Sequence, residues 1–317
     1  MKGLTGIVLV MQVLGSGACF AGEATGVLGT LPALQQSVAH GSEITREVVG
    51  PRAAGYAPGA NFTGAEIRGE TAPPFARKIE DAAAYDGFDV AGPHLLIEGA
   101  TFTGPLDIYT PLPVVMRGVT VRLADGGHWA IHTRPGAGPF YFLWSEAGAA
   151  AGKSSPGSTA LLLRANDATV YRSHIAQASD AIHADAATAV ITENLIDALV
   201  THPGDHNDAI QIPPQARNIS IERNHIHNRN PQTSCIYNSG SAITVRDNYL
   251  SGGGWVIYGG AKDNGHGGPG ARDVRFTGNI FGLDYFPKSG HFGPVAYWDR
   301  TAIWQRNRFA GGRAIEP

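Results

Sequence analysis

Two histidines, two aspartates and an asparagine fall within one stretch of eleven residues, His202–Ile212. Carboxylates at this density bind a divalent cation, share a proton or act as acid and base, and imidazoles transfer protons near neutral pH. Asp208 begins a short apolar segment, and Asp180 begins an equivalent segment earlier in the chain. We therefore expect the two carboxylates to lie close together, with Asp205 beside them. The three aspartates are a candidate calcium site.

The short apolar segments also predict a row of polar side chains. Residues 180–183, 208–211, 234–237, 255–258 and 294–297 share one pattern, with an apolar residue in third place. Because side chains alternate along a strand, an inward third residue sends the fourth outward. The predicted outward row is His183, Gln211, Tyr237, Tyr258 and Tyr297, with His132 as a possible extension. Such a row offers rings for sugar faces and hydrogen-bonding groups for hydroxyls and carboxylates.

Further candidates flank this row. His206 stands two residues before Asp208 and, together with His183, is a candidate for proton transfer. Lys262, in the glycine-rich stretch 259–268, is a candidate partner for an acidic sugar, and His291 lies in an aromatic stretch at 284–293. We expect both stretches to wall a groove. The alternatives are that the aspartates cap turns and that the tyrosines pack beneath loops.

A repeat in the chain predicts how these residues are positioned. Alternating strands end in asparagine at 194, 224, 248, 279 and 307, at spacings of 30, 24, 31 and 28 residues. Short strands at this period, without helices between them, predict an all-β solenoid, a right-handed parallel β-helix over residues 93–317. We expect the asparagines to form a hydrogen-bonded ladder.

The N-terminal part lacks the repeat. Residues 1–21 have a basic start, an apolar stretch and small residues, which predict a signal peptide and a secreted or periplasmic protein, with a buried first strand as the alternative. Residues 22–92 are expected to be an N-terminal cap with short helices near 30–40 and 75–85. After cleavage Cys235 stands alone, and we interpret it as a small core residue.

Composition excludes some partners. The formal charge of −3 leaves no basic footprint for nucleic acid, and no apolar run past the N-terminus is long enough to span a membrane.

Several runs carry a resemblance to a known group. Residues 205–211, the strand at 218–221 and the stretches 252–258 and 293–297 resemble secreted bacterial right-handed β-helix repeat proteins of the pectate-lyase-like superfamily. The resemblance covers roughly residues 90–310 and implies a carbohydrate-active enzyme. Pectate lyases use an arginine base and calcium held by carboxylates, and no arginine of the predicted row matches that base.

Three functions follow from these expectations. The first is a polysaccharide lyase acting on an acidic, uronate-containing glycan, with His183 or His206 as the base, Tyr237 or Tyr258 as the acid, and Gln211 or a cation neutralising the carboxylate. An epimerase would use the same groups. The second is an inverting glycoside hydrolase that uses paired aspartates. The third is a glycan-binding protein without catalysis.

Overall fold

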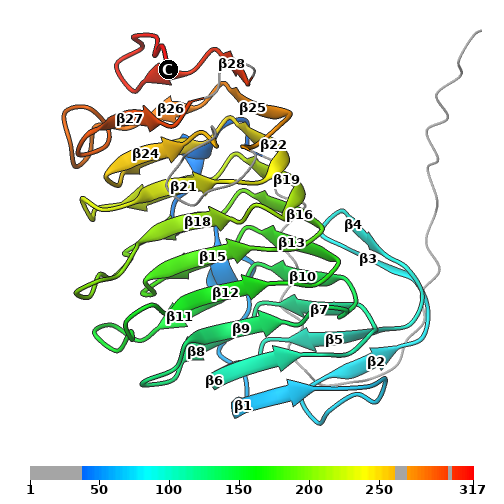
Figure 1. Cartoon of the computed structure of the whole chain (residues 1–317). Helices are drawn as coiled ribbons and strands as arrows, with labels where there is room; N and C mark the ends of the chain where they lie inside the picture. The colour runs from blue at the N-terminus through cyan, green and yellow to red at the C-terminus, as the bar shows by residue number, and fades with distance from the viewer. Residues whose placement is uncertain (1–37, 261–269, 299–301) are drawn as a thin grey trace, which may run out of the picture. The chain divides into compact units, whose positions relative to one another are not determined.

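The computed structural model describes residues 38–260, 270–298 and 302–317, and nearly all of their regular structure is β-strand (Figure 1). Helix is limited, in these residues, to the 3₁₀ turn η1 (Gly41–Glu43) and to α1 (Gly50–Ala53). No helix of the described residues is long and apolar enough to cross a membrane. The predicted signal peptide lies outside the described residues, as does most of the helix expected near 30–40.

The strands recur in three series, and one strand of each series makes up a repeating unit that we call a coil. The first series is β9 (Trp129–Thr133), β12 (Thr159–Leu163), β15 (Asp180–Ala184), β18 (Asp208–Ile212), β21 (Ser234–Asn238), β24 (Trp255–Tyr258) and β27 (Gly293–Ala296). The second is β2 (Arg77–Ile79), β5 (His94–Glu98), β7 (Val114–Arg117), β10 (Phe140–Leu143), β13 (Asp167–Tyr171), β16 (Thr188–Thr192), β19 (Arg217–Glu222), β22 (Ser241–Arg246), β25 (Val274–Thr277) and β28 (Ile303–Gln305). The third is β8 (Thr120–Leu123), β11 (Glu146–Ala149), β14 (His174–Ala176), β17 (Leu195–Asp197), β20 (His225–Asn228), β23 (Tyr249–Gly252), β26 (Ile280–Phe281) and β29 (Arg308–Phe309).

Apart from β2, which pairs antiparallel with β5, each strand of a series pairs in parallel with its equivalent in the next coil, for example β12 with β15 and β15 with β18. The long strands β1 (Asn61–Ile67) and β6 (Thr101–Ile108) pair with each other, and β6 pairs with both β8 and β9. The first and third series thus form one sheet and the second series forms another. Long parallel sheets with almost no helix are consistent with the predicted parallel β-helix.

Apolar residues stack from coil to coil in the core. Ile182, Ile210, Ile236 and Ile257 are fully buried and follow one another in register. Next in the column is Val295, which pairs with Ile257. A single coil cannot bury its own apolar side chains. Stacking of coils buries them in a continuous core and thereby supplies the stability.

The predicted asparagine ladder is confirmed. The buried series is Asn194, Asn224, Asn248, Asn279 and Asn307. From Asn224 onward, each carboxamide oxygen accepts the backbone N–H and the side-chain N–H of the asparagine one coil earlier, at 2.9–3.1 Å, and that of Asn194 accepts the backbone N–H of Ser173 at 2.9 Å. Ser173 and Ser145 extend the ladder, because their hydroxyl oxygens accept backbone N–H groups in the same way. The ladder fixes the bend between the second and third series.

The helix predicted over residues 75–85 is wrong. Residues 77–79 form β2, antiparallel to β5, and the hairpin of β3 (Ala83–Tyr85) and β4 (Phe88–Val90) follows. The ring of Phe75 packs between those of Phe62 and Phe102, with centroids 5.4 and 5.1 Å away. Phe75 and Ile79, which suggested a helical face, are therefore partly buried in a β-strand region instead.

The segment 38–60 follows the stack of coils before β1 begins. His40 Nε2 bonds to the carbonyl of Gly278 at 3.1 Å, the N–H of Gly50 donates to the carbonyl of Arg172, and the carbonyl of Ala60 accepts from the N–H of Thr101. The segment therefore passes from the last coils to the first, and in Figure 1 it is the blue chain behind the strands. The strand stack itself begins at β1, ahead of residue 93.

Candidate functional site

The predicted outward row exists along the first series. His183, Gln211, Tyr237 and Tyr258 lie opposite one another in consecutive coils. His183, Gln211 and Tyr258 are partly exposed, whereas Tyr237 is buried. The row is therefore continuous. The side chains of His183, Gln211 and Tyr258 are more accessible to solvent than that of Tyr237.

The position predicted for Tyr297 needs a correction. Ala296, not Tyr297, lies opposite Tyr258, and Tyr297 follows the end of β27 with φ 50°. Tyr297 is nevertheless 43% exposed, and its ring stacks on that of Tyr258 at 5.4 Å and 25°. The Tyr258 ring in turn lies 5.2 Å from the Tyr237 ring. Three tyrosine rings thus form a ladder at the C-terminal end of the row.

His132 does not adjoin His183, because Leu162 lies between them in the register. Its side chain is 2% exposed, and neither ring nitrogen has a hydrogen-bond partner among the described residues. Burial lowers the pKa of His132 to about 4, with a smaller opposing effect from Asp107. His132 is therefore a neutral, enclosed imidazole rather than a groove residue.

Two arginines beside the row were missed. Arg134 and Arg164 follow His132 and Leu162 by two residues, so alternation places them on the same side as the row. Arg164 Nε lies 3.2 Å from Asp185 Oδ2, and 38% of the Arg164 side chain is exposed. The spacing of two residues from His132 and Leu162 was the sequence signal that could have identified both arginines.

The imidazole of His183 has the neutral form that a general base requires. Burial lowers its pKa, opposed by Asp185 and supported by the positive charge of Arg164. The imidazole is therefore neutral at pH 7 and can accept a proton. It is next to a cation that can hold an anionic group of a substrate.

The carboxylates of Asp180 and Asp208 do lie in neighbouring coils, as predicted. The N–H of Asp208 donates to Asp180 Oδ1 at 2.8 Å, and the Ser234 hydroxyl donates to Asp208 Oδ1 at 2.5 Å. Ala181 and Ala209, which follow the two aspartates, lie in the core together with Ile182 and Ile210, so strict alternation does not hold at this end of the strands. Burial raises the pKa of Tyr237 and of Tyr258 in the row, and the charge of Asp208 adds to this effect, so the carboxylate pair lies within electrostatic reach of the row.

Burial dominates the protonation of this pair. It raises the pKa of Asp180 to about 8, helped by the charges of Asp208 and Asp205. It raises the pKa of Asp208 to about 7, opposed by the hydrogen bonds of Ser234. The pair thus holds at least one proton at neutral pH.

The remaining candidates are scattered. Asp205 caps a turn: its oxygens accept the N–H groups of Gly157 and His202 at 2.9 and 3.0 Å. His206 is exposed, and His291 is exposed between the rings of Phe286 and Phe292. Lys262 lies outside the described residues.

Each of the predicted metal ligands already accepts a hydrogen bond. The oxygens of Asp205 are engaged by backbone N–H groups and Asp208 by Ser234, and no group of three or more possible ligands occurs among the residues that the structure describes. Calcium dependence stays a prediction for experiment.

A second polar group on the third series was not predicted. His225 Nε2 lies 2.9 Å from His227 Nε2, and the Tyr249 hydroxyl donates to Asp284 at 2.7 Å. Burial lowers the pKa of both histidines, that of His225 to about 4. The His-x-His spacing was the signal, since residues two apart share one side of a strand. Farther along the same series lie Arg122, Glu146, His174 and Asp197.

Comparison with known proteins gives no relative. No protein-family model matches the chain, and no curated protein or solved structure is similar to it.

Proposed function

We propose that the protein is a secreted or periplasmic right-handed parallel β-helix that acts on an acidic polysaccharide, as a lyase that cleaves uronate-containing glycans by β-elimination. One observation carries the proposal: a neutral imidazole, His183, neighbours the partly exposed Arg164 in a row that ends in stacked tyrosines. Titratable groups with shifted pKa values beside an aromatic surface are typical of enzyme sites.

The reaction needs a neutralised carboxylate and a base. Arg164 would pair with the uronate carboxylate, which acidifies the proton at C5, and His183 would remove that proton. The C4–O bond then breaks as the C4–C5 double bond forms, and the imidazolium returns its proton to the leaving oxygen. One residue on one side of the sugar can perform both transfers.

The tyrosines are better suited to binding than to acid catalysis. Coils are roughly 4.8 Å apart, so Tyr258, three coils from His183, is roughly 14 Å away along the row. Tyr237 is nearer but is buried. We assign Tyr258 and Tyr297 to stacking on sugar rings farther along the chain, and Gln211 to hydrogen bonding with the substrate.

The test is a screen of the protein against acidic polysaccharides, following the ultraviolet absorbance of unsaturated uronate with and without a chelator. New absorbance that the chelator leaves unchanged is the expected result. Absorbance that the chelator abolishes would establish a metal-dependent lyase and overturn the assignment of neutralisation to Arg164.

Two other outcomes would overturn the lyase proposal. New reducing ends without absorbance would favour a hydrolase that uses Asp180 and Asp208. Binding without any product would leave a glycan-binding protein.

A further inference from the structure

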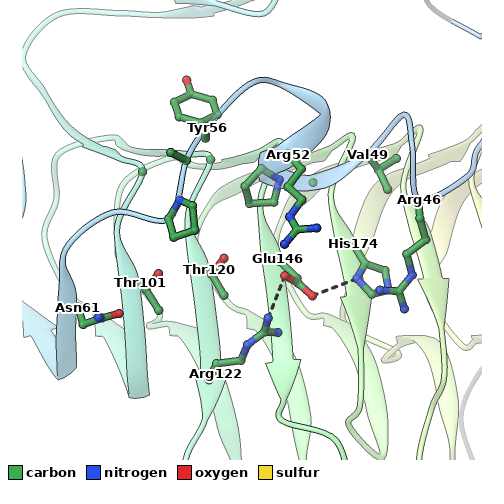
Figure 2. Close-up of a pocket in the computed structure, with 16 residues that line it drawn as sticks. Arg46, Val49, Arg52, Tyr56, Asn61, Thr101, Thr120, Arg122, Glu146 and His174 are labelled. Carbon is green, nitrogen blue, oxygen red and sulfur yellow. Dashed lines mark hydrogen bonds and ion pairs between the residues drawn. The ribbon is translucent and has the colours of Figure 1, made fainter. Parts of the chain in front are cut away.

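A pocket of about 620 Å³ lies away from the row, on the outward side of the third series. The strands β8, β11 and β14 and the start of β6 form its floor, and the segment 46–61 forms its wall (Figure 2). This volume suits a small-molecule ligand of the size of one or two sugar rings.

A chain of ion pairs crosses the pocket floor. Arg122 Nη2 lies 2.9 Å from Glu146 Oε2, and the other oxygen of Glu146 lies 3.3 Å from His174 Nδ1. His174 Nε2 lies 2.8 Å from Asp197, which also pairs with Arg46 at 3.2 Å. Both ring nitrogens of His174 thus face carboxylates, so the imidazole is held as a cation.

The protonation of these groups follows from their contacts. Burial disfavours the charged forms of both His174 and Glu146. The hydrogen bonds of Asp197 and Glu146 nevertheless raise the pKa of His174. The hydrogen bonds of His174 and Arg122 likewise outweigh burial and lower the pKa of Glu146 to about 2. Glu146 and Asp197 are therefore ionised, and each is already paired with cations.

Arg52 adds a positive charge that has no carboxylate partner among the described residues. It projects from the wall toward Glu146, and its side chain is exposed. The cations Arg46, Arg52, Arg122 and His174 outnumber Glu146 and Asp197 by two. The pocket therefore has a surplus of positive charge that an anion would neutralise.

The other end of the pocket offers groups for hydroxyls. Thr101 and Thr120 project from the floor, and Asn61 stands at the edge. Tyr56 closes this end over Gly118, where a Cβ atom would lie 2.1 Å from the tyrosine ring. Threonine and asparagine both donate and accept hydrogen bonds, as a polyhydroxylated ligand requires.

The wall is fixed rather than loose. The N–H of Gly50 donates to the carbonyl of Arg172, and the buried side chains of Ile44 and Val49 pack with Leu195. The pocket is therefore largely formed before a ligand arrives, which reduces the cost of binding.

We propose that this pocket binds a small carboxylated sugar, with Arg52 paired to the carboxylate and Thr101, Thr120 and Asn61 bonded to hydroxyls. The proposal goes beyond the proposed lyase activity, because the site lies on another series of strands and shares no residue with the row. It holds whether or not the row is catalytic.

The experiment is calorimetric titration of the full chain with D-glucuronate, with neutral D-glucose as the matched ligand. We expect glucuronate to bind and glucose to bind at least tenfold more weakly. Arg52→Gln should weaken glucuronate binding about tenfold, the loss of one charge-assisted contact. Arg275→Gln, which changes an exposed arginine on β25, is the control and should leave the affinity unchanged.

The variant Arg164→Gln distinguishes binding in this pocket from binding at the row. Retention of glucuronate binding in Arg164→Gln, together with its loss in Arg52→Gln, supports the proposal. Loss in Arg164→Gln with retention in Arg52→Gln would assign the binding to the row and overturn it. Absence of glucuronate binding by the unaltered protein, or equal binding of glucose, would also overturn it.

Discussion

Replacement of Asn224 by alanine tests the asparagine ladder at an interior rung. The Asn224 carboxamide oxygen accepts the backbone N–H and the side-chain N–H of Asn194, both at 2.9 Å. Its amide group donates to the carbonyl of Ile191 at 2.8 Å and to Asn248 at 3.0 Å. Asn224→Ala removes all four contacts at a site with no exposure to solvent.

The cost can be worked out from what the neighbours lose. The Asn194 side chain keeps its bond to Val170, but the backbone N–H of Asn194 is left buried without its partner. A stranded buried donor costs about 1–3 kcal/mol, and the lost bond to Ile191 adds about 0.5–1.5 kcal/mol. We expect the free energy of unfolding to fall by about 2–4 kcal/mol.

Urea denaturation of Asn224→Ala and of the unaltered protein measures this difference, and the m-value should stay constant. Asn166→Ala is the matched control, because Asn166 is exposed; it should change the free energy of unfolding by less than about 0.5 kcal/mol. A loss below about 1 kcal/mol in Asn224→Ala, or equal losses in both variants, would refute the reasoning.

Two further predictions concern the first series. Tyr258→Ala should raise KM for an acidic polysaccharide several-fold and change kcat less, because the ring lies between Tyr237 and Tyr297; an unchanged KM in steady-state assays would contradict the stacking role. The raised pKa of Asp180 contributes stability below about pH 4 that is lost as the pH rises to about 8. Asp180→Asn should therefore reduce the fall in the free energy of unfolding between pH 5 and pH 8, as urea titrations at both pH values would show.

Most of the fold could be predicted from the repeat, because each strand and its asparagine form a local pattern that recurs. The register of β27, the last strand of the first series, could not be predicted from the local pattern. Gly293 lies opposite Trp255, whose ring covers it so closely that a Cβ atom would lie 2.6 Å away. β27 is thus displaced by one residue from the predicted register, with Val295, rather than Ala296, in the core column.

The candidate site was predicted only in part, for a physical reason. Alternation correctly placed His183 opposite Gln211 in the row, but the hydrogen bonds that engage Asp180 and Asp208 come from neighbouring coils and could not be predicted from local spacing. The wall of the pocket on the third series could not be predicted in this way. The segment 38–60 has no repeat, and its contacts join residues as far apart as His40 and Gly278, 238 positions along the chain.

The most direct test of the proposed function is the turnover of His183→Gln on the acidic polysaccharide that the unaltered protein degrades, compared with His206→Gln. The absorbance of unsaturated uronate should appear at least about 100-fold more slowly with His183→Gln, because the base is lost, whereas the exposed His206 should be dispensable. A His183→Gln rate within twofold of the unaltered protein, with folding intact, would contradict the account.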